Sequence, residues 1–413
     1  MGVVGLGYVG LPTALDLMAS GSKVIGFDVD LRRLAAIGAG DVDLHPADHA
    51  RLRTFRHRAE LTLTSEPHRL ADADTVIICV PTPVDRNLVP ELRALSSACS
   101  TVVEHAVYGQ MIILTSTTYV GTTRDLLARP LTERGFQVGH DVHVAFSPER
   151  IDPGNSRHVA AKTPRVVGGM TGECTRRAVA LLGRVAPAVH PVGSPEAAEM
   201  AKLLENTFRA VNIALANEFA DASRYFGLDP MEVIGAAATK PFGFMPFYPG
   251  PGVGGHCIPC DPHYLLWQLR GSRLFMPLID AAMTVIAKRP GEVVERVGQV
   301  LATCERSRSG ARVLIVGVTY KPGVADVRES PALEIMQRLA DCGSQVAYTD
   351  PLVPSLTLGN TSLTSRPEPM AEKWDLVVVH TLHPDVDLSW LQDQEQVLDA
   401  TYRLTDLKNR TVV

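Results

Sequence analysis

The sequence predicts an α/β protein with two Rossmann-like domains, each built on an open parallel sheet, joined by a long central helix. Three observations predict this class. A strand, a glycine-rich turn, a helix and a second strand open the chain; a strand, helix and strand recur after residue 310; and a long run between them contains no helix breaker. We expect domains at 1–190, 191–295 and 296–413.

Composition narrows the class of protein. The chain has 413 residues and is 46% apolar and 21% charged, which is enough to bury several globular cores. A net charge of -5 provides no basic field, so we expect no nucleic-acid and no membrane partner. The N-terminal residues lack the basic region of a signal peptide, and we expect no leader or lipid anchor. The odd number of cysteines, 7, favours reduced thiols in the cytoplasm over a secreted disulfide framework.

The opening segment predicts a nucleotide site. Strands are expected at 1–4 and 23–27, and the helix between them follows a G-x-G-x-x-G turn. Gly5 permits the tight turn, Gly7 permits close approach of a pyrophosphate, and Gly10 permits close packing of the helix. The backbone N–H groups at the start of the helix then favour a phosphate.

The second strand ends in an acidic residue that bears on the choice of cofactor. Asp28 is placed for the adenosine ribose hydroxyls, and its charge repels a 2′-phosphate, so the pattern favours NAD over NADP. Arg32 and Arg33 follow closely and leave NADP open. A further strand, 74–81, fits the same sheet, and its end at Thr82 is either a cofactor contact or a hydroxyl that starts a loop.

The central helix is expected over 196–226, with Ser194 as its cap and Gly227 as its end. Polar residues share one of its faces at helical spacing, namely Glu199, Lys202, Asn206 and Asn217. Such a stripe is commonly a solvated face. Asparagine is a poor helix former but a good amide donor, which also favours a cleft.

The C-terminal part repeats the opening pattern with a strand, a helix and a strand at 312–317, 330–342 and 345–349. Its turn, Gly317–Gly323, lacks the phosphate-binding glycines, so it is expected to bind something other than a dinucleotide, or nothing. Lys321 and Arg328 could hold a diphosphate, although surface loops commonly carry such cations.

The segment from Tyr248 to His263 is rich in glycine and proline, which predicts an irregular loop rather than a strand or helix. Three chemistries compete for its histidines and cysteines, which are His256, Cys257, Cys260 and His263. Structural zinc lacks a second cysteine pair, and a redox C-x-x-C lacks the strand and helix expected around it. A covalent thiol nucleophile beside Asp261 fits a protein that already has a nicotinamide site, and we expect no metal.

The chain resembles the nucleotide-sugar 6-dehydrogenases, the group of UDP-glucose, UDP-N-acetylhexosamine and GDP-mannose dehydrogenases, over nearly its whole length. Seven blocks carry the resemblance in order: GLGYVGLP (5–12), CVPTP (79–83), STTYVGTT (116–123), SPERIDPG (147–154), EMAKLLENTFRAVNIALANE (199–218), PGVGGHCIPCDP (251–262) and YKPGVADVRESPA (320–332). The resemblance implies an N-terminal domain for NAD⁺, a homodimer formed through the central helix, and a C-terminal domain that binds the nucleotide diphosphate of the sugar substrate.

The resemblance also implies a mechanism. Cys257 would add to the aldehyde left by a first hydride transfer, a second NAD⁺ would oxidise the thiohemiacetal to a thioester, and water would release the carboxylate. Lys202 and Asn206 would face the developing alkoxide. The remaining catalytic residues implied are Asp261, Thr117 and Glu149, with Glu149 as the expected base for hydrolysis.

Binding residues follow from the same resemblance. Cofactor contacts are expected from Gly5, Gly7, Tyr8, Val9, Gly10, Asp28, Arg33, Pro81, Thr82, Ser116, Thr117 and Arg328. Substrate contacts are expected from Glu149, Arg150, Lys202, Asn206, Tyr248, Gly250, Gly254 and Lys321.

The motifs containing SPERIDPG and GHCIPCDP are closest to the branch acting on N-acetylhexosamine nucleotides. We therefore expect UDP-N-acetylglucosamine or a related UDP-sugar as the substrate, with UDP-glucose or a thymidine analogue as alternatives. Cys260 departs from the family, which often has Lys or Val there. Two alternative functions remain. A β-hydroxyacid dehydrogenase would have the same fold but would transfer one hydride without a thiol, and a non-enzymatic scaffold would bind NAD without turnover.

Overall fold

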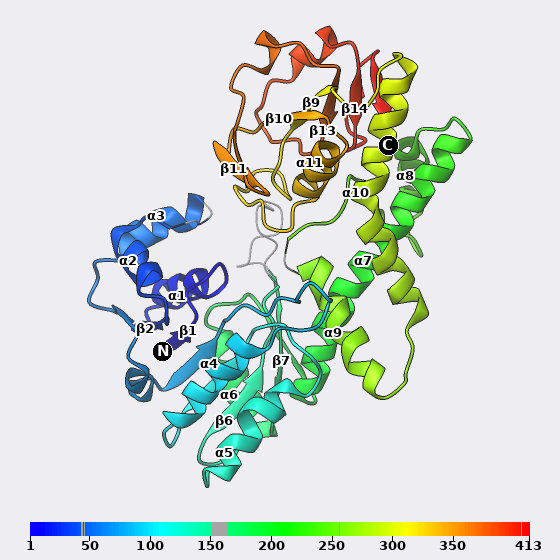
Figure 1. The fold of residues 1–413 in the computed structure, drawn as a ribbon. Helices are drawn as coiled ribbons and strands as arrows, with labels where there is room; N and C mark the ends of the chain where they lie inside the picture. Colours follow the sequence, from blue (N-terminus) through cyan, green and yellow to red (C-terminus); the bar gives the residue numbers. More distant parts are fainter. Residues whose placement is uncertain (43, 45, 151–162, 256, 406) are drawn as a thin grey trace. The chain divides into compact units, whose positions relative to one another are not determined.

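The computed structural model describes residues 1–413 except 43, 45, 151–162, 256 and 406 (Figure 1). The chain forms two compact units, which we describe separately. Unit 1 contains Met1–Glu205 and His263–Leu274, and unit 2 contains Asn206–Pro262 and Phe275–Val413. In the described part of the chain, no helix is both long enough and apolar enough to cross a membrane.

Unit 1 is built on an eight-stranded sheet with the order β3-β2-β1-β4-β5-β6-β7-β8. Neighbouring strands are parallel except for β6 and β7, which are antiparallel. The strands are β1 (Gly2–Val4), β2 (Val24–Phe27), β3 (Leu61–Thr64), β4 (Thr75–Ile78), β5 (Met111–Leu114), β6 (His143–Phe146), β7 (Arg165–Gly169) and β8 (Val189–Val192). Because β1 lies between β2 and β4, the strand order reverses there, which is where such sheets bind ligands.

Helices cover both faces of this sheet (Figure 1). They are α1 (Gly10–Ala19), α2 (Leu31–Ala39), α3 (Pro46–Phe55), α4 (Arg93–Glu104), α5 (Arg129–Glu133) and α6 (Gly172–Leu182), with a 3₁₀ turn η1 (Pro67–Asp72) and a π turn η2 (Arg124–Ala128). Along β4, Val76 and Ile78 pack in the cluster that contains α4, whereas Ile77 packs in the cluster that contains α1 and α6. This alternation follows from the two-residue period of a strand and makes the sheet doubly wound.

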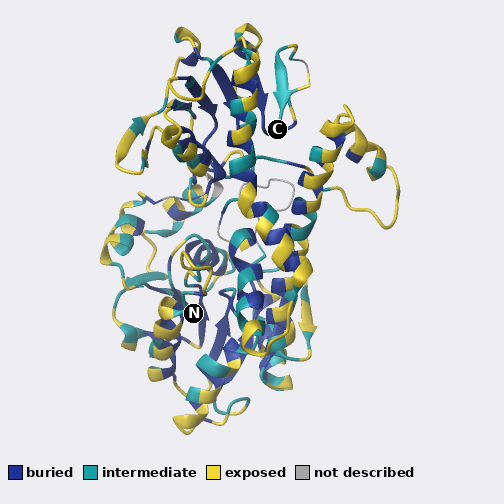
Figure 2. Cartoon of the chain, turned by 45° about the vertical axis from the view of Figure 1, so that its right-hand side comes forward, coloured by how far each residue is buried: buried dark blue, intermediate teal, exposed yellow. Residues whose placement is uncertain are grey.

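Unit 2 contains the second parallel sheet, with the order β10-β9-β13-β14-β15. Its strands are β9 (Arg312–Val316), β10 (Gln345–Thr349), β13 (Leu376–Val379), β14 (Val397–Asp399) and β15 (Arg410–Val412), beside a hairpin of β11 (Ser355–Leu358) and β12 (Thr361–Thr364). Its helices include α8 (Pro230–Ala238), α10 (Pro277–Thr303) and α11 (Pro331–Asp341), and its 3₁₀ turns are η4 (Pro369–Ala371) and η5 (Ser389–Asp393). The central strands of both sheets are buried (Figure 2), and the predicted fold class is confirmed.

The long helix α7 (Pro195–Tyr225) is formed as predicted. The hydroxyl of Ser194 accepts a hydrogen bond of 3.2 Å from the backbone N–H of Ala197, which is the expected cap. One side of α7 is exposed and apolar, and its residues are Met200, Leu204, Phe208, Leu215 and Phe219.

The prediction of an irregular loop over the whole of Tyr248–His263 was wrong at its C-terminal end. Helix α9 runs from Cys257 to Gly271 and therefore contains both cysteines of the C-x-x-C motif. Pro259 lies in its first turn, where a missing N–H costs nothing, and Pro262, further along, removes at most one hydrogen bond. Both prolines are therefore compatible with this helix.

Candidate active site

The glycine turn after β1 has the shape expected of a phosphate cradle. Gly5 has a φ of +85°, and a Cβ there would lie 2.9 Å from the carbonyl oxygen of Cys79. A Cβ on Gly10 would overlap the carbonyl oxygen of Gly5, whereas a Cβ on Gly7 would meet no atom within 4 Å. Val9 makes no side-chain cap for α1. Close packing within the protein therefore requires glycine at positions 5 and 10. At position 7 the protein leaves open space, so the absence of a side chain there allows a ligand to approach the backbone.

Asp28 closes this turn from the end of β2. Its Oδ2 accepts 2.8 Å from the N–H of Leu6 and its Oδ1 accepts 2.9 Å from the N–H of Asp30. Arg33 donates from Nε to the carbonyl oxygen of Leu6 at 2.9 Å. The side chain of Arg32 is 92% exposed and pairs with Asp30. Asp28 is thus fixed beside the turn, as a ribose-binding carboxylate must be.

The ends of β4 and β5 are tied together by hydroxyl groups. Thr115 donates to the carbonyl oxygen of Ile78 at 2.7 Å, and Ser116 donates to that of Val80 at 2.7 Å. Of the other predicted cofactor contacts, Tyr8, Thr82 and Thr117 are half-buried and Pro81 is exposed. Cys79 is buried here, and burial raises the pKa of its thiol to about 11, which excludes it as a nucleophile at neutral pH.

The segment after Thr117 is held by two residues of unit 1, Glu199 on α7 and Gln268 on α9. The carboxylate of Glu199, 1% exposed, accepts hydrogen bonds from the N–H of Gly121 at 2.5 Å, the N–H of Thr123 at 2.9 Å and the hydroxyl of Thr123 at 2.7 Å. Burial raises the pKa of Glu199, and these donors oppose that shift. From α9, Gln268 accepts from the N–H of Val120 at 3.0 Å and donates to its carbonyl oxygen at 2.7 Å.

Two predicted substrate residues follow β6 and form ion pairs within unit 1. Glu149 pairs with Arg165 at 2.8 Å, where both side chains are nearly buried. Arg150 pairs with Glu205 at 2.6 Å and donates to the carbonyl oxygen of Pro164 at 2.8 Å. The rest of the predicted motif in this region, 151–154, lies outside the described residues, as does His256.

Lys202 and Asn206 lie one turn apart on α7 and are 7% and 9% exposed. The side-chain amide of Asn206 donates to Oδ2 of Asp261, which is 3% exposed on α9. Asp261 follows Cys257, the first residue of α9, by one turn, and Cys257 itself is exposed. The hydrogen bond therefore joins the amide predicted on α7 to the helix that carries the predicted nucleophile.

The glycine loop before α9 packs closely against the C-terminal domain's first long loop. A Cβ on Gly254 would lie 2.6 Å from the carbonyl oxygen of Glu329 and 2.7 Å from Cβ of Tyr320. Gly252 has a φ of +147°, and a Cβ there would lie 2.8 Å from Pro331. The glycines of PGVGG thus pack directly against the segment YKPGVADVRESPA. This close contact explains why these positions have no side chain.

Gly250, at the start of the same loop, is held at both ends of its peptide unit. Its N–H donates to Oδ1 of Asn217 at 3.0 Å, and its carbonyl oxygen accepts from Nε of Arg289 at 3.1 Å. Asn217, predicted as part of the polar face of α7, therefore orients this loop. Tyr248, two residues earlier, is 42% exposed.

The loop that carries Lys321 is anchored from β10 and β13. His383 donates from Nε2 to Asp350 at 3.1 Å, and its Nδ1 accepts from the N–H of Gly323 at 3.1 Å. The hydroxyl of Thr319 donates to the carbonyl oxygen of Lys321 at 3.0 Å. Lys321 itself is half-buried. Further along, the guanidinium of Arg328 forms an ion pair with the carboxylate of Asp326, and the shortest nitrogen–oxygen distance is 2.7 Å.

The turn after β9 in the C-terminal half resembles the glycine turn after β1 but lacks its phosphate-binding shape. Val318 N–H donates to Oδ2 of Asp350 at 2.7 Å, as Leu6 does to Asp28. However, α11 begins at Pro331, far beyond Gly317, whereas α1 begins only five residues after Gly5. His383 also takes up one oxygen of Asp350. As predicted, this half lacks a dinucleotide fingerprint.

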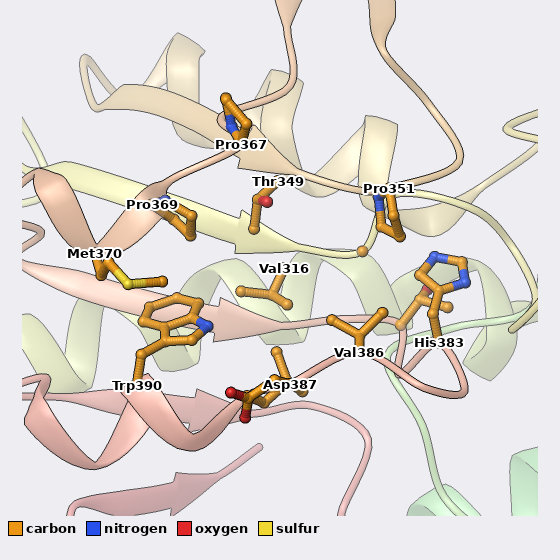
Figure 3. Close-up of a pocket in the computed structure, with 13 residues that line it drawn as sticks. Val316, Thr349, Pro351, Pro367, Pro369, Met370, His383, Val386, Asp387 and Trp390 are labelled. Carbon is orange, nitrogen blue, oxygen red and sulfur yellow. The ribbon is translucent and has the colours of Figure 1, made fainter.

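A cavity of about 120 Å³ lies at the carboxyl ends of β9, β10 and β13 (Figure 3). Trp390 and Met370 line one end of it, and His383 lines the other. Of the predicted site residues in the described part of the chain, none lines this cavity.

Three domain models of one family match the chain in order. The NAD binding domain of the UDP-glucose/GDP-mannose dehydrogenase family matches residues 1–185, its central domain matches 196–286, and its UDP binding domain matches 314–411. The chain belongs to the UDP-glucose/GDP-mannose dehydrogenase family. It is therefore an NAD-dependent nucleotide-sugar dehydrogenase, as its motifs predicted.

Individual members of this family align over almost the whole chain. The UDP-N-acetyl-D-glucosamine 6-dehydrogenase of Pseudomonas aeruginosa is 32% identical over 412 residues, covering 98% of this chain and 96% of that protein. The UDP-N-acetyl-D-mannosamine dehydrogenase of Pyrococcus horikoshii is 33% identical over 384 residues, covering 93% and 89%. The solved structure of UDP-D-ManNAc dehydrogenase from Pyrococcus horikoshii has a TM-score of 0.90 at 30% identity and covers 100% of this chain and 98% of that chain.

The first domain of this dehydrogenase fits NAD. The surroundings of Gly7 are open to an approaching pyrophosphate, and the carboxylate of Asp28 stands beside the turn. Gly5, Gly7 and Gly10 would hold the pyrophosphate, and Asp28 would hold the ribose.

Sequence reasoning missed the residues that support the dehydrogenase site from a distance. Arg289 is fully buried in α10, where it contacts Asp221, Glu292 and the hydroxyl of Tyr402 in addition to Gly250. An arginine inside the apolar pattern of a predicted helix was the available signal. The partners of Glu199 and the contacts of His383 had no local signal in the sequence.

Proposed function

We propose that this dehydrogenase oxidises the C6 hydroxyl of a UDP-N-acetylhexosamine to the carboxylate in two steps, through a thioester on Cys257. The observation that carries the proposal is the arrangement on α9: an exposed Cys257 at the first residue, and a buried Asp261 one turn later bonded to Asn206. The P. aeruginosa and P. horikoshii relatives are named for UDP-N-acetyl-D-glucosamine and UDP-N-acetyl-D-mannosamine, which supports this substrate class.

Bound NAD⁺ would accept a hydride in each of the two oxidations. Cys257 would add its thiolate to the aldehyde carbon, because an aldehyde has no hydride to give up until a nucleophile makes it tetrahedral. The start of a helix presents unpaired N–H groups and a partial positive charge, which favours a thiolate at this position. Water would then cleave the thioester and regenerate the thiol.

Lys202 and Asn206 would stabilise the oxygen that becomes negative in both steps. They are separated by one turn on the same face of α7. One amide hydrogen of Asn206 is used by Asp261, which fixes the amide plane and leaves the second hydrogen for the oxyanion. We assign Asp261 this orienting role together with proton transfer.

Glu149 would act as the base for thioester hydrolysis, and Thr117 would position the water. The nearly buried ion pair of Glu149 with Arg165 orients the carboxylate. We assign Arg150, Tyr248, Gly250, Gly254 and Lys321 to the substrate, and Tyr8, Val9, Arg33, Pro81, Thr82, Ser116 and Arg328 to the cofactor, as the family motifs indicate. We keep domain boundaries near 190 and 295. We assign the enzyme to the cytoplasm because its cysteines are free thiols, which a reducing compartment favours.

We also propose that the enzyme is a homodimer formed through α7. Its exposed stripe includes Leu204 at 65%, Phe208 at 46% and Phe219 at 55% exposure, at spacings that keep one face of the helix apolar. An apolar face of this kind marks a protein interface. Light scattering should show a dimer that dissociates in Phe219→Glu and persists in Glu218→Lys; a wild-type monomer would reject the interface.

The test of the reaction is the stoichiometry of NADH formed per nucleotide sugar consumed, measured over a panel that includes UDP-N-acetylglucosamine, UDP-N-acetylmannosamine, UDP-glucose and dTDP-glucose. We expect two NADH per sugar for one of the first two. Cys257→Ser should lose turnover, whereas Cys342→Ser, at an exposed cysteine elsewhere, should retain it. One NADH per sugar, or an active Cys257→Ala variant, would indicate the β-hydroxyacid type of chemistry instead.

A further inference from the structure

Cys257 and Cys260 lie in the first turn of α9, three residues apart. In an α-helix this spacing places the two Cα atoms about 5 Å apart, given the rise and radius of the helix. A disulfide requires Cα atoms between about 4.4 and 6.8 Å apart. The backbone of α9 therefore already holds the two residues at a distance that a disulfide can bridge.

The two thiols differ in environment. Cys257 is exposed, whereas Cys260 is 5% exposed. Side chains in a helix point toward its N-terminus, so the geometry of a helix favours a direction for the side chain of residue 260 back toward the turn that contains Cys257. An exposed thiol at a helix start followed by a buried thiol one turn later is the arrangement of thiol–disulfide oxidoreductases.

Two other buried cysteines, Cys79 and Cys99, lack this reactivity. Burial raises the pKa of Cys79 to about 11 and that of Cys99 to about 12. At neutral pH both remain thiols, which react slowly with oxidants. Oxidation should therefore bypass Cys79 and Cys99.

We propose that Cys257 and Cys260 form a site of reversible oxidation by hydroperoxides. The Cys257 thiolate attacks the peroxide oxygen, forming sulfenic acid while the alkoxide or hydroxide leaves and is protonated. The Cys260 thiol then attacks the sulfenic sulfur, which forms the S–S bond and releases water. Two electrons pass from the two thiols to one peroxide, and a dithiol reductant restores both thiols.

The consequence for turnover rests on the proposed role of Cys257 as the nucleophile. A disulfide would withdraw that sulfur from the aldehyde and stop the reaction. It would also keep Cys257 from irreversible oxidation to sulfinic acid, because the sulfenic acid is consumed by Cys260. Cys260 would thus convert permanent inactivation into a reversible one.

The experiment treats the full-length enzyme with hydrogen peroxide and maps the peptide containing both cysteines by mass spectrometry without reduction. In parallel, activity is measured before and after dithiothreitol. Cys260→Ser removes the second thiol, Cys260→Ala replaces it if the serine variant does not fold, and Cys342→Ser serves as the matched control. Alkylation before digestion prevents exchange between thiols.

In the wild type and in Cys342→Ser, we expect the peptide to lose two hydrogens and dithiothreitol to restore nearly all activity. In the Cys260 variants, we expect sulfinic acid on Cys257, with recovery lower by about tenfold at the same exposure. Sulfenic or sulfinic acid on Cys257 of the wild type without the linked peptide would overturn the inference. A linked peptide with full activity would support the oxidation site and count against Cys257 as the catalytic nucleophile.

Discussion

Replacing Arg289 by methionine removes the buried cation that fixes the glycine loop. The guanidinium is 0% exposed and donates to the carbonyl oxygen of Gly250 at 3.1 Å and to the hydroxyl of Tyr402 at 2.7 Å. It also pairs with Asp221 at 3.2 Å and Glu292 at 3.0 Å, whose side chains are 39% and 40% exposed. Methionine fills much of the same volume but donates no hydrogen bond.

The size of the effect follows from these four partners. Each hydrogen bond from a charged donor to a shielded acceptor contributes about 1.5 kcal/mol, at the low end of its range because water reaches part of the cluster. Each ion pair with a carboxylate that is partly exposed contributes at most about 0.5 kcal/mol. We therefore expect Arg289→Met to lower the free energy of unfolding of unit 2 by about 3 kcal/mol.

Urea unfolding followed by tryptophan fluorescence measures this change, since two of the 3 tryptophans, Trp374 and Trp390, pack in the C-terminal sheet. For a unit of this size the midpoint should fall by about 1 M. Arg224→Met is the matched control, because Arg224 is 38% exposed and reaches the same Asp221 only at 3.6 Å. Equal midpoints for Arg289→Met and Arg224→Met would refute the reasoning.

Three further outcomes are expected. Gly10→Ala should unfold or lose NAD binding through a clash with the turn, whereas Gly7→Ala should melt like the wild type but bind NAD about tenfold more weakly, by calorimetry. Burial lowers the pKa of His380 to about 4. The contribution of its neutral imidazole to the free energy of unfolding is therefore complete above pH 6.5 and is lost as the pH falls toward 4. Between pH 7 and pH 4, the free energy of unfolding of the wild type, measured by urea titration, should fall by about 3 kcal/mol more than that of His380→Asn. The same dependence on pH in both proteins would contradict this. Gln268→Leu removes both hydrogen bonds to Val120, so amide exchange in residues 118–123 should accelerate about tenfold, and unchanged exchange would contradict the role of this contact.

The sequence predicted well where the signal was local. The glycine turn, α1, β2 and Asp28 follow from spacings within the first thirty residues, and the structure has all of them. The same holds for α7 and its Ser194 cap, because the absence of a breaker is visible in the sequence itself. The repeat at β9, α11 and β10 was visible for the same reason.

The start of α9 shows where local rules were ambiguous. Two prolines within six residues indicate a loop when taken as helix breakers, yet a proline in the first turn of a helix removes only an N–H that has no partner there. The placement of Cys257 and Cys260 on that first turn was therefore decided by the structure. It changed the interpretation of their spacing, since one of the two elements expected around a redox C-x-x-C, the helix, is present.

By itself the sequence determined the fold class, the NAD cradle, the family and the residues that its motifs supply. Only the tertiary structure decided which distant groups hold those residues in place. The examples are the hydrogen bonds of Glu199 with Thr123, of Arg289 with Gly250, and of His383 with the loop that contains Lys321. Secondary structure and glycine turns depend on neighbours within a few residues, so they leave a periodic pattern in the chain. A hydrogen bond between residues far apart in sequence leaves no such pattern, because its partners come together only when the chain has folded.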